Sequence, residues 1–347
     1  MKKTLIALSV LAAISGAAQA QSNVTVYGVL DMALQGENNG GNGAGKTFSL
    51  DSGVQSGSRL GFKGSEDLGN GLKANFKLEM GVNADTGASA QGGLAFGRAA
   101  WVGLSGNFGA VQLGRQNKPM FDAVDSIDPF STGIIGGTAH QSTSATGLGN
   151  LFFATNPRST NTINYTTTNL SGFTGSAAYT FGEAAGDATK GRGIGASGSY
   201  AAGPLYATVA YHAEDVAAVG VANNVIKHVF AGATYDFVVA KAAASYGKVS
   251  SDDNKTAYKL WSLGVTVPVS AAGAVVASVT GVKNDVVTTA NKSTQLALGY
   301  THSLSKRTNV YTSVSRVAND AGVNAGGLAS GLGLTDSMVN VGIRHAF

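Results

Sequence analysis

Apolar and polar side chains alternate with a period of two through almost the whole chain, and this pattern most constrains the fold. The clearest example is residues 72–82, where the even positions are apolar and the odd positions are polar or small. Successive side chains of a strand point to opposite faces of a sheet, so each such segment has one apolar face and one wet face. The pattern predicts an all-β protein.

Sixteen segments of this kind can be laid out, each about ten residues long, the length a tilted strand needs to cross a bilayer. They start near Val24, Ser56, Leu72, Leu94, Ala110, Arg158, Phe173, Arg192, Leu205, Val225, Ala240, Ala257, Gly273, Ser293, Thr308 and Thr335. An even number of antiparallel strands brings both chain ends to the same rim of an up-and-down barrel.

The connections between these segments alternate in length. Short turns with Gly or Ser fall at 65–71, 105–109, 169–172, 201–204, 270–273 and 303–307, and longer polar loops at 36–46, 83–93, 183–191 and 319–334. Short periplasmic turns and long extracellular loops are typical of membrane barrels. Apolar stripes such as Trp261-Leu263-Val265 and Leu296-Leu298-Tyr300 fit a lipid-covered surface. We therefore predict a sixteen-stranded antiparallel transmembrane β-barrel.

The N-terminus has the features of a secretory signal. A positive start at Met1-Lys2-Lys3 precedes an apolar run at 5–14 and the small-x-small sequence Ala18-Gln19-Ala20. The apolar run of about ten residues is too short for a spanning helix, which disfavours an uncleaved membrane anchor. We expect a signal peptide at 1–20 and a barrel domain at 21–347.

Composition excludes several classes of function. The chain has 49 Gly, 5 Pro, no Cys and 13% charged residues, which matches neither a disordered nor a helical protein. Its formal charge of +4 falls to about +2 without Lys2 and Lys3, too little to indicate nucleic-acid binding. After the signal, no apolar window is long enough for a transmembrane helix. Without cysteines or clustered ligands, we expect no metal site and no cofactor.

One connection, residues 117–157, is far longer than usual, which marks it as functional or disordered. Apolar side chains punctuate it: Phe121, Ile127, Phe130, Ile134, Ile135, Phe152 and Phe153. Such anchors predict that the loop packs against another part of the protein. The lumen of a sixteen-stranded barrel is wide enough to admit it.

Five motifs occur in an order that matches a known family. They are the opening strand at 22–31, the stretch 56–74 that contains Ser-x-Arg-x-Gly, Phe96-Gly97-Arg98, Leu113-Gly114-Arg115-Gln116 and the closing residues 341–347. With these motifs the mature chain resembles the β-proteobacterial general porins of Bordetella, Burkholderia and Comamonas type, and more distantly the neisserial porins.

The resemblance implies a homotrimer in the outer membrane of a Gram-negative bacterium, in contact with membrane lipid and lipopolysaccharide. The third extracellular loop, at 117–157, is expected to fold into the lumen as a constriction. Phe347 is expected to be the signal read by the barrel-insertion machinery, and Val339, Val341 and Ile343 keep its alternating phase. The implied function is passive diffusion of inorganic ions and small hydrophilic solutes, with a mild anion preference.

The resemblance also implies a pore constriction in which wall arginines face acidic groups. Matched motif by motif, the candidates are Arg59, Arg98 and Arg158 on the wall, Glu79 at the end of the third strand and Asp122 at the start of the long loop. Rings of basic residues favour anions and acidic rings favour cations.

The alternation supports some of these positions independently. Arg59 takes the face opposite Leu60, and Arg158 faces inward if Ile163 faces lipid. Pattern alone assigns no face to Arg98 or Arg115. Relatives often carry a further arginine where this chain has Asn164, which weakens the expected anion preference. Asp125 and Asp128 are interpreted as solvated loop charges, and Lys63, Lys73 and Lys77 as lumen or turn residues that tune the field.

Three other functions fit the sequence less well. None of the five histidines (His140, His212, His228, His302 and His345) lies in a Gly-x-Ser-x-Gly elbow or a His-x-x-x-His zinc spacing, so we expect no enzyme. A substrate-specific outer-membrane channel is the main alternative, but the aromatic residues of the long loop are scattered instead of forming a track. A purely structural barrel would need no charged constriction and would pass no current.

Overall fold

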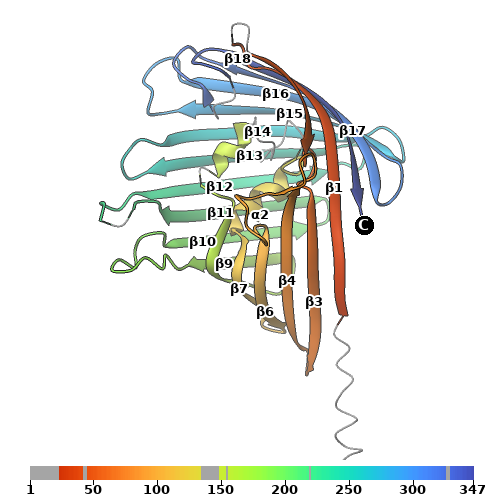
Figure 1. Cartoon of the computed structure of the whole chain (residues 1–347), viewed down its shortest axis with the longest axis vertical. Coiled ribbons are helices and arrows are strands. Elements are labelled where there is room, and N and C mark those ends of the chain that lie inside the picture. Colours follow the sequence, from red (N-terminus) through yellow and green to blue (C-terminus); the bar gives the residue numbers. More distant parts are fainter. Residues whose placement is uncertain (1–22, 42–44, 134–147, 154, 219, 326–328) are drawn as a thin grey trace, which may run out of the picture.

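The computed structural model describes residues 23–41, 45–133, 148–153, 155–218, 220–325 and 329–347. Antiparallel strands dominate and form one closed sheet (Figure 1). The strands are β1 (Asn23–Asn38), β2 (Lys46–Ser52), β3 (Arg59–Gly69), β4 (Leu72–Asn83), β5 (Ala88–Ser89), β6 (Ala99–Gly106), β7 (Gly109–Asn117), β8 (Arg158–Thr166), β9 (Phe173–Thr180), β10 (Gly193–Ala202), β11 (Leu205–Asp215), β12 (Val225–Asp236), β13 (Lys241–Ser251), β14 (Ala257–Pro268), β15 (Gly273–Asn284), β16 (Lys292–Ser303), β17 (Thr308–Asn319) and β18 (Thr335–Ala346). The predicted signal peptide at 1–20 lies outside the described residues.

The long first strand closes the barrel. One edge of β1 pairs with β18, while its other edge pairs with β3 near its start and with β2 near its end. β2 and β3 therefore occupy one strand position, interrupted at residues 53–58, and β5 is a two-residue piece in the loop after β4. The barrel has sixteen strand positions, which confirms the predicted fold.

Fifteen of the sixteen predicted strand starts lie within three residues of the observed ones. The exception is the segment predicted near Leu94, because β6 begins only at Ala99. Gly92 and Gly93 both adopt positive φ and turn the chain just before it. Leu94 fits the apolar alternation of the sequence but lies in this turn, outside any strand. The alternation therefore placed the strand start too early.

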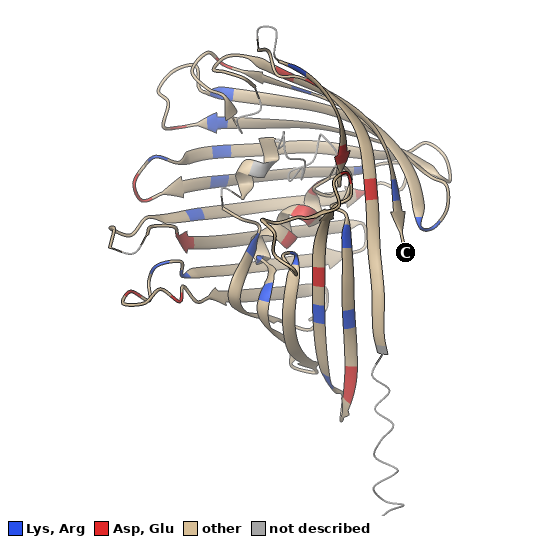
Figure 2. Ribbon diagram, viewed as in Figure 1, with Lys and Arg blue, Asp and Glu red and all other residues tan. Residues whose placement is uncertain are grey.

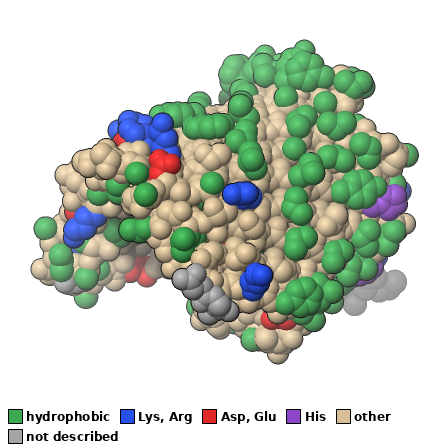
Figure 3. Space-filling model, turned by 90° about the horizontal axis from the view of Figure 1, so that it is seen from above, with side chains coloured by type: hydrophobic (Ala, Val, Ile, Leu, Met, Phe, Trp, Pro, Cys, Tyr) green, Lys and Arg blue, Asp and Glu red, His purple; other side chains and the backbone are tan. Residues whose placement is uncertain are grey.

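Outward side chains are apolar and inward side chains are mostly polar. Trp261 on β14 is 42% exposed and Leu296 on β16 is 57% exposed, whereas the inward-facing Thr280, Gln295 and Ser313 are buried. Figure 3 shows hydrophobic side chains spread over one outer face, with few charged groups between them. No described helix is long and apolar enough to cross a membrane.

The long connection between β7 and β8 contains α2 (Pro119–Ile127) and the 3₁₀ helix η1 (Leu148–Phe152). α2 packs on the inner face of β9–β13, and η1 packs on the inner face of β13–β16 (Figure 1). Glycines make room for this contact. A Cβ at Gly232 would lie 2.8 Å from Ile127, and one at Gly264 would lie 2.4 Å from Pro129.

Candidate functional site

A polar cavity of about 390 Å³ lies between α2 and the wall formed by β3 to β8. All five predicted constriction residues line it: Arg59 from β3, Glu79 from β4, Arg98 just before β6, Arg158 at the start of β8 and Asp122 from α2. The wall contributes the three arginines, and the helix contributes the facing carboxylate. The structure therefore brings the whole predicted set together at one level of the barrel.

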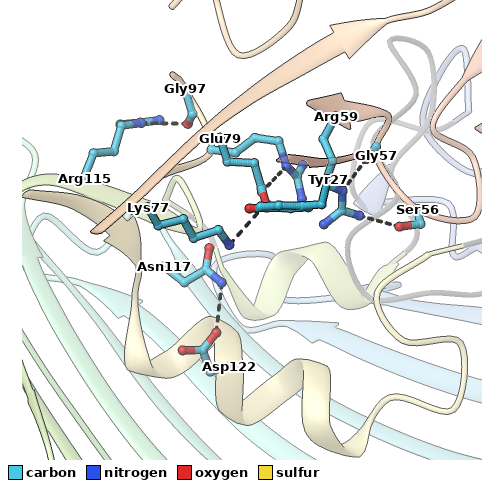
Figure 4. A network of polar contacts seen from close by, with 11 residues as sticks. Tyr27, Ser56, Gly57, Arg59, Lys77, Glu79, Gly97, Arg115, Asn117 and Asp122 are labelled. Atoms are coloured by element: carbon cyan, nitrogen blue, oxygen red, sulfur yellow. Dashed lines mark hydrogen bonds and ion pairs between the residues drawn. The ribbon is translucent and has the colours of Figure 1, made fainter. Parts of the chain in front are cut away.

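Glu79 is the centre of a buried polar cluster on this wall (Figure 4). Its Oε1 lies 2.8 Å from Nε of Arg98, and its Oε2 lies 3.2 Å from Nζ of Lys77. The hydroxyl of Tyr27 on β1 donates a third bond to Oε2, at 2.7 Å. One carboxylate thus faces two cations, which leaves one positive charge in excess and holds both cationic side chains in place.

Arg59 is held by backbone and hydroxyl groups. Its Nε donates to the carbonyl oxygen of Gly57 at 2.9 Å, and a terminal nitrogen contacts Oγ of Ser56 (Figure 4). Asp31 on β1 fixes this segment by accepting the backbone N–H of Ser56 at 2.5 Å and of Gln55 at 2.7 Å. Among the described residues Arg59 has no ion pair, so its charge is not neutralised by a direct contact.

Arg158 packs its guanidinium over the ring of Phe121 on α2, with 5.8 Å from Cζ to the ring centroid. This contact fixes the arginine against the helix that faces it. In the described part of the chain, neither Nε of Arg158 nor Nη1 of Arg98 has a hydrogen-bond partner. Both are buried N–H donors beside the cavity, and a buried donor requires a polar partner.

Asp122 is the acidic group opposite the wall. The side chain is exposed to the cavity, and Nδ2 of Asn117 donates to its Oδ1 at 3.0 Å (Figure 4). Enclosure by the surrounding protein limits its hydration and raises the pKa of Asp122 to about 6, with nearby Asp125 acting in the same direction. Asn117 and Arg158 act in the opposite direction and lower this pKa.

Several cavity residues were not predicted as site residues. Lys77 and Asp125 line the cavity, although Asp125 was interpreted as a solvated loop charge. Lys77 shares the inward parity of Glu79 in β4, so the alternation already contained this signal. Tyr27 also faces inward, but its contact with Glu79 depends on the register of β1 with β3 and β4, which alternation does not give.

The structure shows the contacts of Arg98 and Arg115, the two residues to which the pattern assigned no face. Arg98 precedes β6, points into the cavity and binds Glu79. The pairing of β7 with β8 shifts register between Gly114 and Gln116, and the intervening Arg115 donates its Nε to the carbonyl oxygen of Gly97 at 2.7 Å. Alternation decides neither position, because Arg98 is outside a strand and Arg115 lies opposite the irregularity in β8.

Phe347 takes part in closing the barrel. Its backbone N–H and carbonyl exchange two hydrogen bonds with Gly28, each 3.1 Å long. The ring lies over Gly28, where a Cβ would come within 2.2 Å of it. The side chain is 47% exposed and has the outward phase of Val341 and Ile343.

A closed barrel with an apolar exterior and a charged, enclosed interior defines a membrane channel of the β-barrel class. The Gram-negative porin family matches residues 7–322, and the chain belongs to this family. The protein is accordingly an outer-membrane porin.

Relatives and solved structures agree with this assignment. Outer membrane porin protein 32 of Delftia acidovorans is 38% identical over 364 residues, with all of both chains covered. A Bordetella pertussis outer membrane porin protein is 31% identical over 402 residues, again with full coverage of both. The anion-selective porin from Comamonas acidovorans superposes with a TM-score of 0.79 at 32% identity, over 94% of this chain and 100% of that one.

The same fold recurs at lower identity. A Vibrio cholerae OmpT, solved in a trimer form, has a TM-score of 0.68 at 17% identity, over 94% of this chain and 99% of that chain.

Proposed function

We propose that the charged cavity is the constriction of a general diffusion pore that passes inorganic ions and small hydrophilic solutes with a mild preference for anions. The observation that carries this proposal is the concentration of charge at one level of the lumen. Arg59, Arg98, Arg158 and Lys77 line the cavity from the wall, against Glu79, Asp122 and Asp125. Charges along a narrow passage between low-dielectric walls select ions by sign.

The positions of the charges favour anions more than the simple count does. Glu79 is buried and shared by Arg98 and Lys77, so its negative charge is screened from a passing ion. Arg59 has no ion pair among the described residues, and Arg98 and Arg158 each keep an unsatisfied N–H. A permeating anion can therefore exchange water for guanidinium contacts one after another.

Two features keep the preference mild. Asp122 faces the wall from α2 and carries a negative charge at neutral pH. Asn164 also lines the cavity, at the position where the resembling porins often have another arginine, and it accepts a bond from Ser176 at 2.9 Å. The wall therefore has one positive charge fewer than such relatives.

General diffusion fits this cavity better than a substrate-specific channel. Trp101 and Phe121 are its aromatic lining residues, and Phe121 is covered by Arg158. Two separated rings do not make the continuous aromatic surface on which a sugar would slide. In this proposal the protein catalyses no reaction and needs no cofactor or metal.

The assembly and export of the protein belong to the same proposal. We infer a homotrimer from the resemblance to the general porins, in contact with outer-membrane lipid and lipopolysaccharide. We also infer that residues 1–20 are a cleaved signal peptide and that the barrel-insertion machinery reads Phe347. The outward phase of Phe347 at the end of β18 supports this last role.

Reversal potentials in planar bilayers under a salt gradient test the pore proposal, with wild type beside Arg59→Ala. We expect anion preference in the wild type and a weaker preference in the variant, because an unpaired wall charge is lost. Lys255→Ala, in an extracellular loop with its side chain 85% exposed, is the matched charge-loss control. Unchanged selectivity in Arg59→Ala would remove Arg59 from the constriction, and absence of any channel would favour a structural barrel.

A further inference from the structure

Four lysines on neighbouring strands form a row: Lys248 on β13, Lys259 on β14, Lys283 on β15 and Lys292 on β16. The backbone register places Lys248 directly opposite Lys259, Lys259 opposite Lys283 and Lys283 opposite Lys292. Figure 2 shows basic residues at one level across this part of the sheet. With adjacent strands about 4.8 Å apart, this lysine row is about 14 Å long.

The lysine row lies on the outer surface of the barrel and not in the pore. On β13, β14 and β16 it shares the side-chain parity of the exposed residues Tyr246, Trp261 and Leu296. On β15, Lys283 has the same parity as Gly281. A Cβ at Gly281 would lie 2.3 Å from the indole of the outward-facing Trp261, so this parity is also outward. The side chains of Lys259 and Lys283 are 44% and 45% exposed.

The position of the lysine row along the strands matches the headgroup level of the outer leaflet. Each lysine lies within three residues of the strand end that carries an extracellular loop. Two residues further into the membrane, about 7 Å along the strands, Tyr246 pairs with Trp261. Below them follow Leu263 and Leu296. Aromatic residues mark the membrane interface, so the surface runs from cationic to aromatic to aliphatic, as a lipid does from headgroup to chain.

The lysine row is repulsive without an anion, because like charges directly opposite each other destabilise a sheet. Asp285 relieves part of this repulsion through Lys259 and Lys283, each 2.7 Å away. Lys248 and Lys292 form no ion pair with any described carboxylate, and Asp320 accepts the backbone N–H of Lys292 at 3.0 Å. Four lysines against one aspartate leave an excess of three positive charges.

The neighbouring strand shows that this excess is specific to the row. Lys227, on the extracellular half of β12, faces outward as well, but it forms its own ion pair with Asp252 at 2.6 Å. Its charge is thus already neutralised by the protein.

We propose that the lysine row binds the phosphate groups of a lipopolysaccharide in the outer leaflet, whose acyl chains cover the apolar surface below Trp261. Lysine is a compact cation that suits phosphate, and a row about 14 Å long contacts more than one phosphate of the same molecule. The apolar strip beneath selects a lipid over a free anion. This site depends on the outer-membrane position of the barrel and is independent of the charges in the constriction.

Binding of fluorescent lipopolysaccharide to the purified full-length barrel in detergent tests this site. The variant carries Lys248→Gln, Lys259→Gln, Lys283→Gln and Lys292→Gln. Each lysine near an anionic lipid surface contributes about fivefold in affinity, equivalent to about 1 kcal/mol, so the fourfold variant should bind more than about 100-fold more weakly. A matched control neutralises four cations near the periplasmic ends of their strands, at Lys73, Lys241, Lys306 and Arg307, and should bind within about twofold of wild type.

Two further probes separate a lipid site from an ion site. The first probe is dephosphorylated lipopolysaccharide, which should bind the wild type only as weakly as intact lipopolysaccharide binds the fourfold variant. The second is inorganic phosphate, which at equal concentration should not displace lipopolysaccharide from the wild type. Displacement by inorganic phosphate would overturn the lipid assignment. Equal lipopolysaccharide affinity of wild type and row variant would overturn the site itself.

Channel measurements on the same fourfold variant serve as the control for folding and pore function. The row variant should form channels of wild-type conductance and selectivity, because its substitutions lie outside the lumen. If the fourfold variant does not fold, Lys248→Gln and Lys259→Gln are measured singly, each with an expected loss of about fivefold. Loss of lipid binding with an intact channel supports the lysine row whether or not the constriction is anion-selective.

Discussion

The guanidinium of Arg98 and the carboxylate of Glu79 lie 2.8 Å apart, from Nε to Oε1, and both side chains are buried in the wall beside the cavity. Arg98 comes from the turn before β6, and Glu79 comes from the middle of β4. This pair fixes a cation at the lumen wall but also neutralises it. The selectivity of the pore therefore depends on how much charge the wall carboxylate leaves uncompensated.

Glu79→Gln should strengthen the anion preference. The substitution keeps a hydrogen-bonding side chain near Tyr27 but releases the charges of Arg98 and Lys77 into the field of the cavity. One unit charge acting over about 4 Å is worth about 1 kcal/mol even in water, or about fivefold in local anion concentration. Reversal potentials measure the change, with Asp187→Asn in an extracellular loop as the control. A preference equal to that of wild type would show that Glu79 does not set the field.

Asn164→Arg should also increase the anion preference, because it adds a cation to the lining of the cavity. The expected effect is comparable to that of Glu79→Gln, up to about fivefold in local anion concentration. Single-channel conductance should fall slightly, since arginine is larger than asparagine. Thr289→Arg adds the same charge in an exposed extracellular loop and should leave selectivity unchanged. Equal effects of the two variants would point to surface charge in place of a constriction.

The anion preference should increase as pH falls through about 6. Enclosure raises the pKa of Asp122 to about 6 from its ordinary value of 3.8, so this carboxylate becomes neutral well before an exposed aspartate does. Above this range Asp122 is negative and opposes anions; below it, Asp122 is neutral and this opposition is removed. At pH 7.5, Asp122→Asn should have the stronger anion preference that the wild type shows only at acid pH. Its anion preference should not change between about pH 5 and 7. A step that persists in this variant would assign the titration to another group.

Alternation was sufficient to predict most of the fold. A membrane strand must present lipid-facing residues on one side throughout, so the period of two extends along its whole length and marks its ends. Arg59 and Glu79 lie within such strands, and their inward faces follow directly from parity. Arg158 lines the cavity too, but parity counted from Ile163 does not explain it, because the register of β8 against β7 shifts between Ser159 and Thr162 and Asn161 there has a φ of 52°.

The remaining features depend on contacts that a single segment does not encode. Arg98 lies outside a strand and Arg115 lies at a register shift, so neither has a face that parity defines. The bond from Tyr27 to Glu79 requires the relative register of three strands. Likewise, the loop anchors predicted packing, but the glycine positions that receive Ile127 and Pro129 become apparent only in three dimensions.

Phe347→Ala should separate closure of the barrel from its insertion in cells. The backbone bonds between Phe347 and Gly28 do not require the ring, so folding of the purified protein in detergent should stay close to wild type. Assembly into the outer membrane should fall sharply if the ring is the insertion signal. Phe173→Ala removes another outward phenylalanine near the periplasmic rim and should assemble normally. Equal assembly of both variants would contradict the signal role of Phe347.

Gly232→Val should displace α2 from the inner wall and weaken selectivity. The new side chain would collide with Ile127, which already lies 2.8 Å from the ideal Cβ position. Overpacking of this kind costs about 1–3 kcal/mol, enough to shift a loop segment without unfolding the barrel. As α2 carries Asp122 and Phe121, we expect a larger conductance and a smaller difference between wild type and Arg59→Ala. Gly198→Val is the matched control, because no heavy atom lies within 4 Å of its Cβ position. Wild-type conductance in Gly232→Val would mean that the position of α2 does not limit the pore.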